Sequence, residues 1–526
     1  MDRWRMRFRI LLAIAAGIPL LVGIYAVVRF LPDRPVTYSD IREHFKYGST
    51  GGERNAGFPY WIWRALPVVF KDKLPQNGAP GYEAFGLIFE KDANGKPKDL
   101  PIGVMKRRNL GIDRVFVNCA VCHHSTVRVA ADQQPQIILG MPAARFNLGA
   151  FENFLCDIAV DERFDSDDLI PEVERQAGRL SLVDRYLVYP IAISLMQQRL
   201  IMLRHRFLPM HPETWGPGRV DTFNSAKALF NFPFHEVPPS ELRGAADFPS
   251  IWNQGPREGM QLHWDGNNCR VEERNKSAAF GTGTTPATID LTAIARVEKW
   301  LRDELKAPPW PKEKYPIDQT RAARGQVLYT QLCANCHGKS GTDFSSTCGH
   351  QTPQNVAVAR CEAQGKDVPY GDCVGEVTPV SEVKTDAHRL DSYTYDLAAN
   401  QSLLYAGKAY RFRHFRKTYG YANMPLDGIW IRAPYLHNGS VPTLRDLLDP
   451  GDARPKSFYR GYDVLDPIKV GFICTVARES GRRFDLYETR DASGNIIPGN
   501  GNQGHEYGVN LAPADKDAIV EYLKTF

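Results

Sequence analysis

Five stretches of the chain carry apolar residues in patterns that predict helices. Residues 10–31 form an almost unbroken apolar run, and about 20 such residues span a bilayer. Residues 180–208 are apolar at helical spacing and are interrupted by one proline. Residues 289–305, 320–332 and 513–526 each place apolar side chains on one helical face. The pattern therefore predicts a mainly α protein behind an N-terminal transmembrane helix.

Two of these helices resemble each other, which indicates an internal repeat. The order of apolar and small residues in 293–301 returns in 518–523, close to the chain end. Each copy would close one unit, and Gly325 would let the last helix cross residues 320–332 at close range. We therefore expect three parts: a transmembrane helix at 1–31, a first unit at 32–314 and a second unit at 315–526. Residues 35–114, rich in Gly, Pro and aromatics, predict long loops inserted in the first unit.

A short cysteine–histidine motif in each unit indicates which cofactor the unit binds. Cys119, Cys122 and His123 form a Cys-x-x-Cys-His sequence, and the same sequence returns at residues 333–337. Two thiols at this spacing, followed at once by an imidazole, are typical of covalently attached heme c. A lone pair of such cysteines is also compatible with a zinc or disulfide pair, but two full copies favour two covalent hemes. The units are then two cytochrome c-like heme domains, bound through Cys333, Cys336 and His337 in the second copy.

Charge and the N-terminal run indicate where the protein works. The formal net charge is +5, and residues 1–31 supply +4 of it through five arginines less Asp2. The rest of the chain is close to neutral, which excludes a basic nucleic-acid-binding surface. Arginines before the apolar run favour a cytoplasmic N-terminus and heme domains in the periplasm, anchored in the inner membrane of a bacterium. A cleaved signal peptide is the alternative.

Six of the ten cysteines lie outside the two motifs. In an oxidising compartment an even remainder suggests disulfides. Cys348, Cys361 and Cys373 lie close together in a polar insertion after the second motif, where we expect a disulfide-stapled loop. Free buried thiols are the alternative.

The sixth ligand of each iron decides between electron transfer and catalysis, because an open iron can bind O2 or peroxide. His123 and His337 supply the proximal ligands by their place in the motifs. For the second heme we choose His505, which precedes the last helix; His437 and Met424 are its rivals, and an exposed loop histidine is the alternative. No comparable residue is found for the first heme, so we expect an open or weakly occupied iron at His123.

Residues 424–444, from Met-Pro-Leu-Asp-Gly to Leu-His-Asn-Gly-Ser-Val-Pro-Thr-Leu, resemble the signature of the bacterial diheme cytochrome c peroxidase superfamily. The residues of this stretch are most similar to those of the RoxA-like, rubber-oxygenase-like branch of that superfamily. Residues 250–254 and 263–268 are the matching stretch of the first unit, and the alignment sets Trp264 against His437. The resemblance implies that Trp264 lies between the hemes and relays electrons; a core tryptophan beside a heme is the alternative.

The chain departs from the peroxidases at one place. Downstream of the tryptophan they carry a glutamate that moves peroxide protons, whereas residues 275–285 of this chain contain no carboxylate. RoxA-like oxygenases place a phenylalanine over the open heme at about this position, so the resemblance implies Phe280 in that role. Glu272 and Glu273 lie too near Trp264 for the glutamate's spacing, and we interpret them as surface or propionate-side residues.

The sequence predicts a membrane-anchored periplasmic diheme cytochrome c acting as a redox enzyme. The first heme would bind O2 or peroxide, as a RoxA-like oxygenase or a peroxidase, and the second would transfer electrons. The alternative is an electron carrier in which both hemes are six-coordinate. The expected partners are a small cytochrome, cupredoxin or quinol-linked complex, and the anchor favours a small apolar substrate over bulk polymer.

Overall fold

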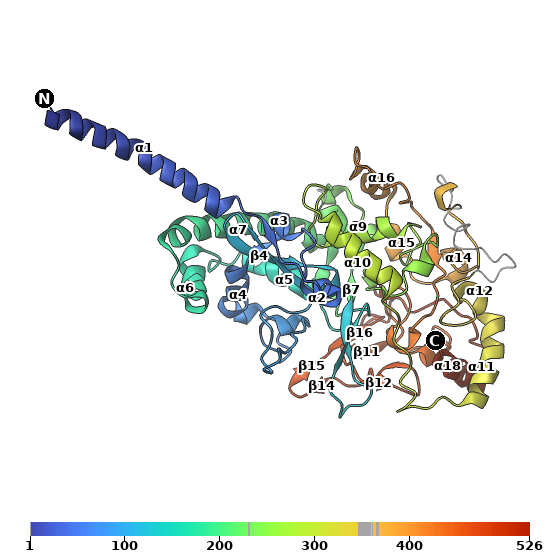
Figure 1. The fold of residues 1–526 in the computed structure, drawn as a ribbon. Coiled ribbons are helices and arrows are strands. Elements are labelled where there is room, and N and C mark those ends of the chain that lie inside the picture. Colours follow the sequence, from blue (N-terminus) through green and yellow to red (C-terminus); the bar gives the residue numbers. More distant parts are fainter. Residues whose placement is uncertain (1, 230–231, 346–358, 360, 364–367) are drawn as a thin grey trace.

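The computed structural model describes the chain except residues 1, 230–231, 346–358, 360 and 364–367. One long helix, α1 (Asp2–Phe30), projects from a body that holds all other elements (Figure 1). Residues 4–30 are long and apolar enough to cross a membrane, and their side chains pack against nothing in the body over most of that length. A signal sequence has the same character, so the structure is compatible with either an anchor or a leader.

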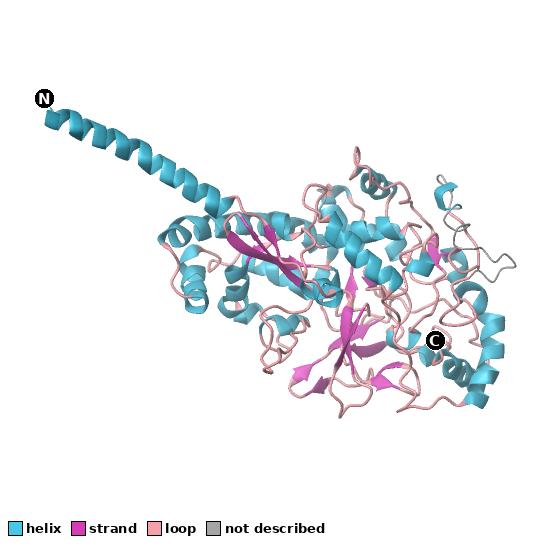
Figure 2. Cartoon of the chain, in the orientation of Figure 1, coloured by secondary structure: helices cyan, strands magenta, loops and turns pink. Residues whose placement is uncertain are grey.

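The body is a helix-rich mixture of short helices, small sheets and long loops (Figure 2). Its largest sheet has the antiparallel order β1 (Arg34–Pro35), β3 (Val104–Asn109), β4 (Ile112–Val117), β2 (Phe58–Pro59). The expectation of only loops between residues 35 and 114 was therefore wrong. Charged residues such as Arg107 and Arg114 interrupt the alternation of both central strands, which hid the hairpin from the hydrophobic pattern.

The long apolar stretch after residue 180 forms α7 (Tyr189–Phe207), which packs on α5 (Leu148–Ala159). A π-helical turn at Asp184–Val188 leads into it. Pro190 was expected to break this helix, but it lies in the first turn of α7 directly after the π-helical turn, and the helical backbone continues through it. Two further helices complete the first-half core: α4 (Tyr60–Val69) and α6 (Ser166–Ala177).

Each of the two expected units contains one helix that packs against its last helix. In the first half α2 (Ile41–Tyr47) packs on α10 (Leu291–Asp303), with the Phe45 and Trp300 rings 5.3 Å apart. In the second half α11 (Gln319–Leu332) packs on α18 (Pro513–Leu523). A Cβ atom on Gly325 would lie 1.9 Å from the carbonyl oxygen of Ala518, so only glycine allows this crossing, as expected.

The other elements are short. The helices are α3 (Glu53–Ala56), α8 (Thr222–Leu229), α9 (Val271–Gly281), α12 (Ala334–His337), α14 (Val380–Val383), α15 (His388–Ser392), α16 (Tyr395–Leu403) and α17 (Leu444–Leu447). Antiparallel pairs join β5 (His124–Val127) to β6 (Gln136–Leu139), β7 (Arg219–Val220) to β8 (Ala246–Asp247), β9 (Val377–Pro379) to β10 (Gly420–Ala422), β11 (Ser457–Arg460) to β16 (Asp485–Glu488), β12 (Leu465–Asp466) to β13 (Gly471–Phe472), and β14 (Arg478–Glu479) to β15 (Arg482–Arg483).

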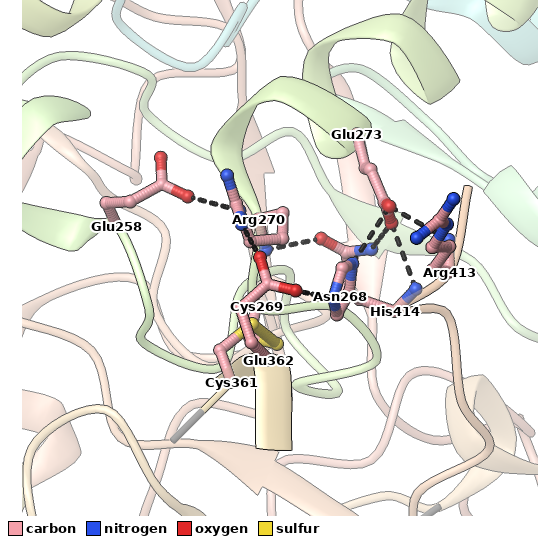
Figure 3. The surroundings of a disulfide bond; sticks show 9 residues. All are labelled: Glu258, Asn268, Cys269, Arg270, Glu273, Cys361, Glu362, Arg413 and His414. Atoms are coloured by element: carbon pink, nitrogen blue, oxygen red, sulfur yellow. Dashed lines mark hydrogen bonds and ion pairs between the residues drawn. A yellow bond between two sulfur atoms is a disulfide. The ribbon is translucent and has the colours of Figure 1, made fainter. Parts of the chain in front are cut away.

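One disulfide joins the two halves. Cys361 is bonded to Cys269, 92 residues earlier, rather than inside its own insertion (Figure 3). Cys373 is disulfide-bonded as well, while Cys348 lies outside the described residues. The expected loop staple is thus corrected for Cys361, whose bond ties the insertion to the segment before α9. Beside it Glu273 is buried and accepts hydrogen bonds from the backbone of Arg413 and His414, which excludes the surface position but not the propionate-side position we expected as its alternative.

Candidate cofactor-binding site

The first Cys-x-x-Cys-His motif follows strand β4 as a single tight turn. Asn118 caps the 3₁₀ turn Cys119–Val121 by accepting a hydrogen bond from the Ala120 N–H. The turn ends at His123, whose Nδ1 donates to the carbonyl oxygen of Pro249, 2.9 Å away. Cys119 and Cys122 are free thiols and line a cavity of about 900 Å³ together with His123.

The second motif is α-helical rather than a 3₁₀ turn, but its histidine makes the same kind of contact. It leaves the C-terminus of α11 and forms α12. The Nδ1 atom of His337 donates to the carbonyl oxygen of Met424 at 2.8 Å, as His123 does to Pro249. Cys333 and Cys336 are free thiols too.

These contacts suit histidines that bind a metal. A backbone carbonyl on Nδ1 fixes the tautomer and orients the ring, which leaves Nε2 free as the ligand atom. Burial lowers the pKa of His123 to about 3 and also lowers the pKa of His337, so both imidazoles are neutral. Burial raises the pKa of Cys119 and of Cys336 to about 11, which keeps these thiols protonated. Neutral imidazoles beside protonated thiols fit a group that is attached through thioethers and ligated by histidine.

The structure brings His505 to His337. Their ring centres lie 6.1 Å apart, with a gap between the two rings. An imidazole nitrogen binds a transition metal at about 2.0 Å, so two imidazoles on opposite sides of one ion have ring centres about 6 Å apart. The observed spacing therefore fits a single iron between them. The pKa of His505 is lowered to about 3, first by burial and then by the charge of His337.

Neither rival of His505 occupies that gap. His437 stacks on Tyr421 with ring centres 4.1 Å apart, and its Nε2 is hydrogen-bonded to the Tyr421 hydroxyl at 3.0 Å. Met424 directs its sulfur toward Arg257, while its carbonyl oxygen accepts the bond from His337.

The surroundings of His123 are different. The cavity beside it is mostly apolar, and Phe280 of α9 and Trp264 contribute to its wall. In the part of the chain that the structure describes, no second histidine ring faces His123 as His505 faces His337. His263 lies in the cavity wall, however, and its buried Nε2 has no hydrogen-bond partner in that part of the chain.

Two further residues of the cavity wall were missed from the sequence. Glu152 of α5 has a buried, unpartnered carboxylate oxygen, and burial followed by the nearby Asp221 raises its pKa to about 8. Arg274 of α9 lies close enough to lower the pKa of His123, and burial lowers its own pKa to about 10. Both residues come from segments remote from the motif, and their helical patterns give no hint of a shared wall.

Trp264 lies between the cavity and residues of the second expected unit, 315–526. Its Nε1 donates to the carbonyl oxygen of Asp247 at 2.8 Å, and its own carbonyl accepts from Ala422 N–H at 2.8 Å. The indole packs against the apolar cluster of Val383, Leu390 and Tyr421. The backbone of Val383 in turn accepts a hydrogen bond from His505. A continuous series of contacts therefore runs from the His123 cavity to the His337–His505 pair.

The backbone around Trp264 repeats that around His437, as the alignment expects. Gly266 and Gly439 have φ angles of +65° and +63°, and the residue before each aligned ring, His263 or Leu436, has φ +65°. An isolated β-bridge closes each of the two turns. Leu262 pairs with Asn268 in the first turn and Tyr435 pairs with Val441 in the second, at the same distance along the chain.

Comparison with known proteins places part of this region in a described family. Residues 420–459 match a family model described as RoxA-like, cytochrome c-like. Two Sinorhizobium fredii proteins are similar over a longer span: the uncharacterized protein y4iJ is 27% identical over 371 residues, 59% of this chain and 60% of y4iJ. The uncharacterized protein y4iM is 30% identical over 321 residues, 57% of this chain and 68% of y4iM.

Proposed function

We propose that this chain, which belongs to the family of the rhizobial protein y4iM, binds two heme c groups and uses the first for chemistry and the second for electron transfer. The matched cytochrome c-like region covers only part of one unit. The proposal for two hemes rests on the two motifs, whose histidines share the same carbonyl contact. One observation supports different roles for the two sites: His337 faces His505, whereas His123 faces an apolar cavity.

The second site is suited to electron transfer. With His337 and His505 on opposite sides, no position remains for an external ligand, and little has to move when the charge of the iron changes. Arg454 donates hydrogen bonds to the carbonyl oxygens of Asn502 and Gly504, which fixes the loop that carries His505.

The first site is suited to chemistry on a small oxidant beside an apolar molecule. A heme held by Cys119, Cys122 and His123 would supply the redox chemistry that activates O2 or peroxide. Phe280 and the apolar wall exclude water, which strengthens electrostatic interactions within the cavity. Glu152 holds a proton at neutral pH, because its pKa is about 8, and Arg274 offers a positive charge to anionic groups.

Trp264 is proposed to carry electrons between the sites. Its indole lines the first cavity and packs on the cluster whose Val383 holds the backbone of His505. We further propose that α1 anchors the protein in the inner membrane, with the body in the periplasm, and that a soluble cytochrome, cupredoxin or quinol-linked complex exchanges electrons with it.

The test is ligand binding by the reduced, purified protein. Heme content is measured first and should give two hemes per chain; one or none would contradict the cofactor assignment. Carbon monoxide should then bind to one heme of the two in the wild type, and to both hemes in the variant His505→Gly, which lacks the second ligand of the second iron. Binding to neither heme in the wild type would contradict the catalytic proposal.

A pure electron carrier is the second candidate, and one observation favours it. His263 lies in the first cavity with a buried, unpartnered Nε2, which is a possible ligand atom. If it binds the first iron in the resting protein, the variant His263→Ala should convert that heme from low to high spin. An unchanged spectrum of His263→Ala, with one high-spin heme already present, supports the enzyme. Turnover with peroxide and reduced cytochrome, or O2-dependent cleavage of an isoprenoid, then separates peroxidase from oxygenase.

A further inference from the structure

Helix α7 and the turn before it are apolar on two opposite faces. One face is buried in the first-half core and consists of Tyr189, Ile193, Leu200 and Phe207. The other is exposed: Leu187, Ile191, Leu195 and Met202 follow one another at helical spacing with exposed fractions of 50 to 60%. Two neighbours, Leu182 and Tyr186, are more than 70% exposed. A helix that is apolar all round belongs in a core or in lipid, and the second face has no core to enter.

This exposed face lies beside the foot of the apolar helix α1 (Figure 1). Arg29, in the last turn of α1, forms an ion pair with Asp184 at the start of the π-helical turn, 2.5 Å apart. The next residue, Phe30, contacts Gly111 at the tip of the β3–β4 hairpin. If α1 crosses a bilayer, these contacts hold the exposed face of α7 at the outer surface of that bilayer.

Charge around the face matches a lipid surface. Residues 179–206 contain five arginines and a single acid, Asp184. That acid is paired with Arg29, and one of the five arginines, Arg185, is paired with Glu174 of α6. Basic side chains around an apolar stripe are the composition of helices that lie in the plane of anionic membranes.

The same side chains form the mouth of the cavity at His123. Leu187, Ile191 and Leu195 are half exposed and also line the cavity, as do Phe30 and the exposed Leu110. Deeper in, Leu203 and Phe207 continue the wall toward the motif cysteines. The opening is therefore framed by apolar residues of α7, of the hairpin tip and of the end of α1.

We propose that the exposed face of α7 rests in the outer leaflet of the membrane, and that the cavity at His123 opens into the lipid. A molecule that reaches the cavity by this route is a lipid-soluble, largely apolar chain that never has to enter water. The docking of α7 stands on its own; the role of the arriving molecule as substrate rests on the function proposed above.

The first experiment places p-benzoylphenylalanine at Ile191 of the full chain in bacterial membranes and identifies what it captures on illumination. The matched control carries the same photoprobe at Ile468, which is 81% exposed and lies between β12 and β13. Strand β12 lies far from α1 (Figure 1). We expect phospholipid adducts at residue 191, at least tenfold more than at 468. Capture of a protein at residue 191, or equal lipid adducts at both positions, would overturn the docking.

The second experiment needs no variant. The purified full chain is inserted into vesicles of phosphatidylethanolamine and phosphatidylglycerol that contain a fatty acid with a diazirine at its end carbon. Adducts on peptides holding Leu203 or Phe207, inside the cavity, are expected; adducts confined to α1 would overturn the route through lipid. Heme content and carbon monoxide binding are measured on the same samples, so a failure of the proposed heme chemistry is recognised separately from a failure of membrane access.

Discussion

Replacement of His505 by glycine gives the sharpest test of how the second site works. The ring centres of His337 and His505 are 6.1 Å apart, close to the roughly 6 Å that two imidazoles require around one metal ion. Removal of one ring leaves a gap the size of that ring and no other histidine in it, because His437 is held by stacking on Tyr421. We therefore expect one heme per chain to change from low to high spin, and the other to stay as it was.

Electron paramagnetic resonance of the ferric protein measures this change. The wild type should give one low-spin and one high-spin signal per chain, and His505→Gly should give two high-spin signals. Added imidazole should restore the low-spin signal in the variant by filling the gap. The matched control is His437→Ala, which removes the rival ligand and should leave both signals unchanged. An unaltered spectrum in His505→Gly, or a spin change in His437→Ala, would refute the assignment.

Three further predictions follow from the described geometry. Trp264→Phe should slow heme-to-heme electron transfer in stopped-flow reduction at unchanged heme content, because it removes the indole bond to Asp247; unaltered transfer would count against the relay. Glu152→Gln should gain stability over the wild type as pH rises from 5 to 8, because the folded-state pKa of Glu152 is raised to about 8 and the wild type loses stability until that carboxyl ionises; parallel melting curves across this range would contradict it. Gly325→Ala should lose about 1–3 kcal/mol in urea unfolding, since its Cβ would meet the Ala518 carbonyl, whereas Gly281→Ala, with nothing within 4 Å, should be neutral or gain up to about 1 kcal/mol; equal effects would show that the crossing tolerates a methyl group.

The helices of the two units could be predicted from their sequence because each has one apolar face. The stretch 320–332 is helix α11, and the close crossing at Gly325 follows from a single missing side chain. The β3–β4 hairpin was missed because its solvent face and part of its inner face carry charge, so the period of two is lost. Cys361 was assigned to a local staple because sequence distance was the only guide, while its partner Cys269 comes close only through the fold.

The candidate site also contains some residues that the sequence predicted and others that it did not. His123, His337 and His505 were chosen from their place beside motifs or beside the last helix, which are features of the local sequence. Glu152 and Arg274 belong to helices that converge on the cavity only in three dimensions, and no spacing along the chain relates them to His123.

The disulfide between Cys269 and Cys361 has a consequence for how the protein matures. In the folded chain Cys269 and Cys361 share a disulfide, whereas the four motif cysteines form none. If the chain is exported and takes up heme c, as proposed, the unfolded chain would expose all of these sulfurs to the same oxidants, and two cysteines separated by two residues readily close on each other. The motif pairs would then have to be kept reduced until porphyrin is attached, while the distant pair is oxidised. Assembly would then depend on a reductant and an oxidant that act on different sulfur atoms of one polypeptide.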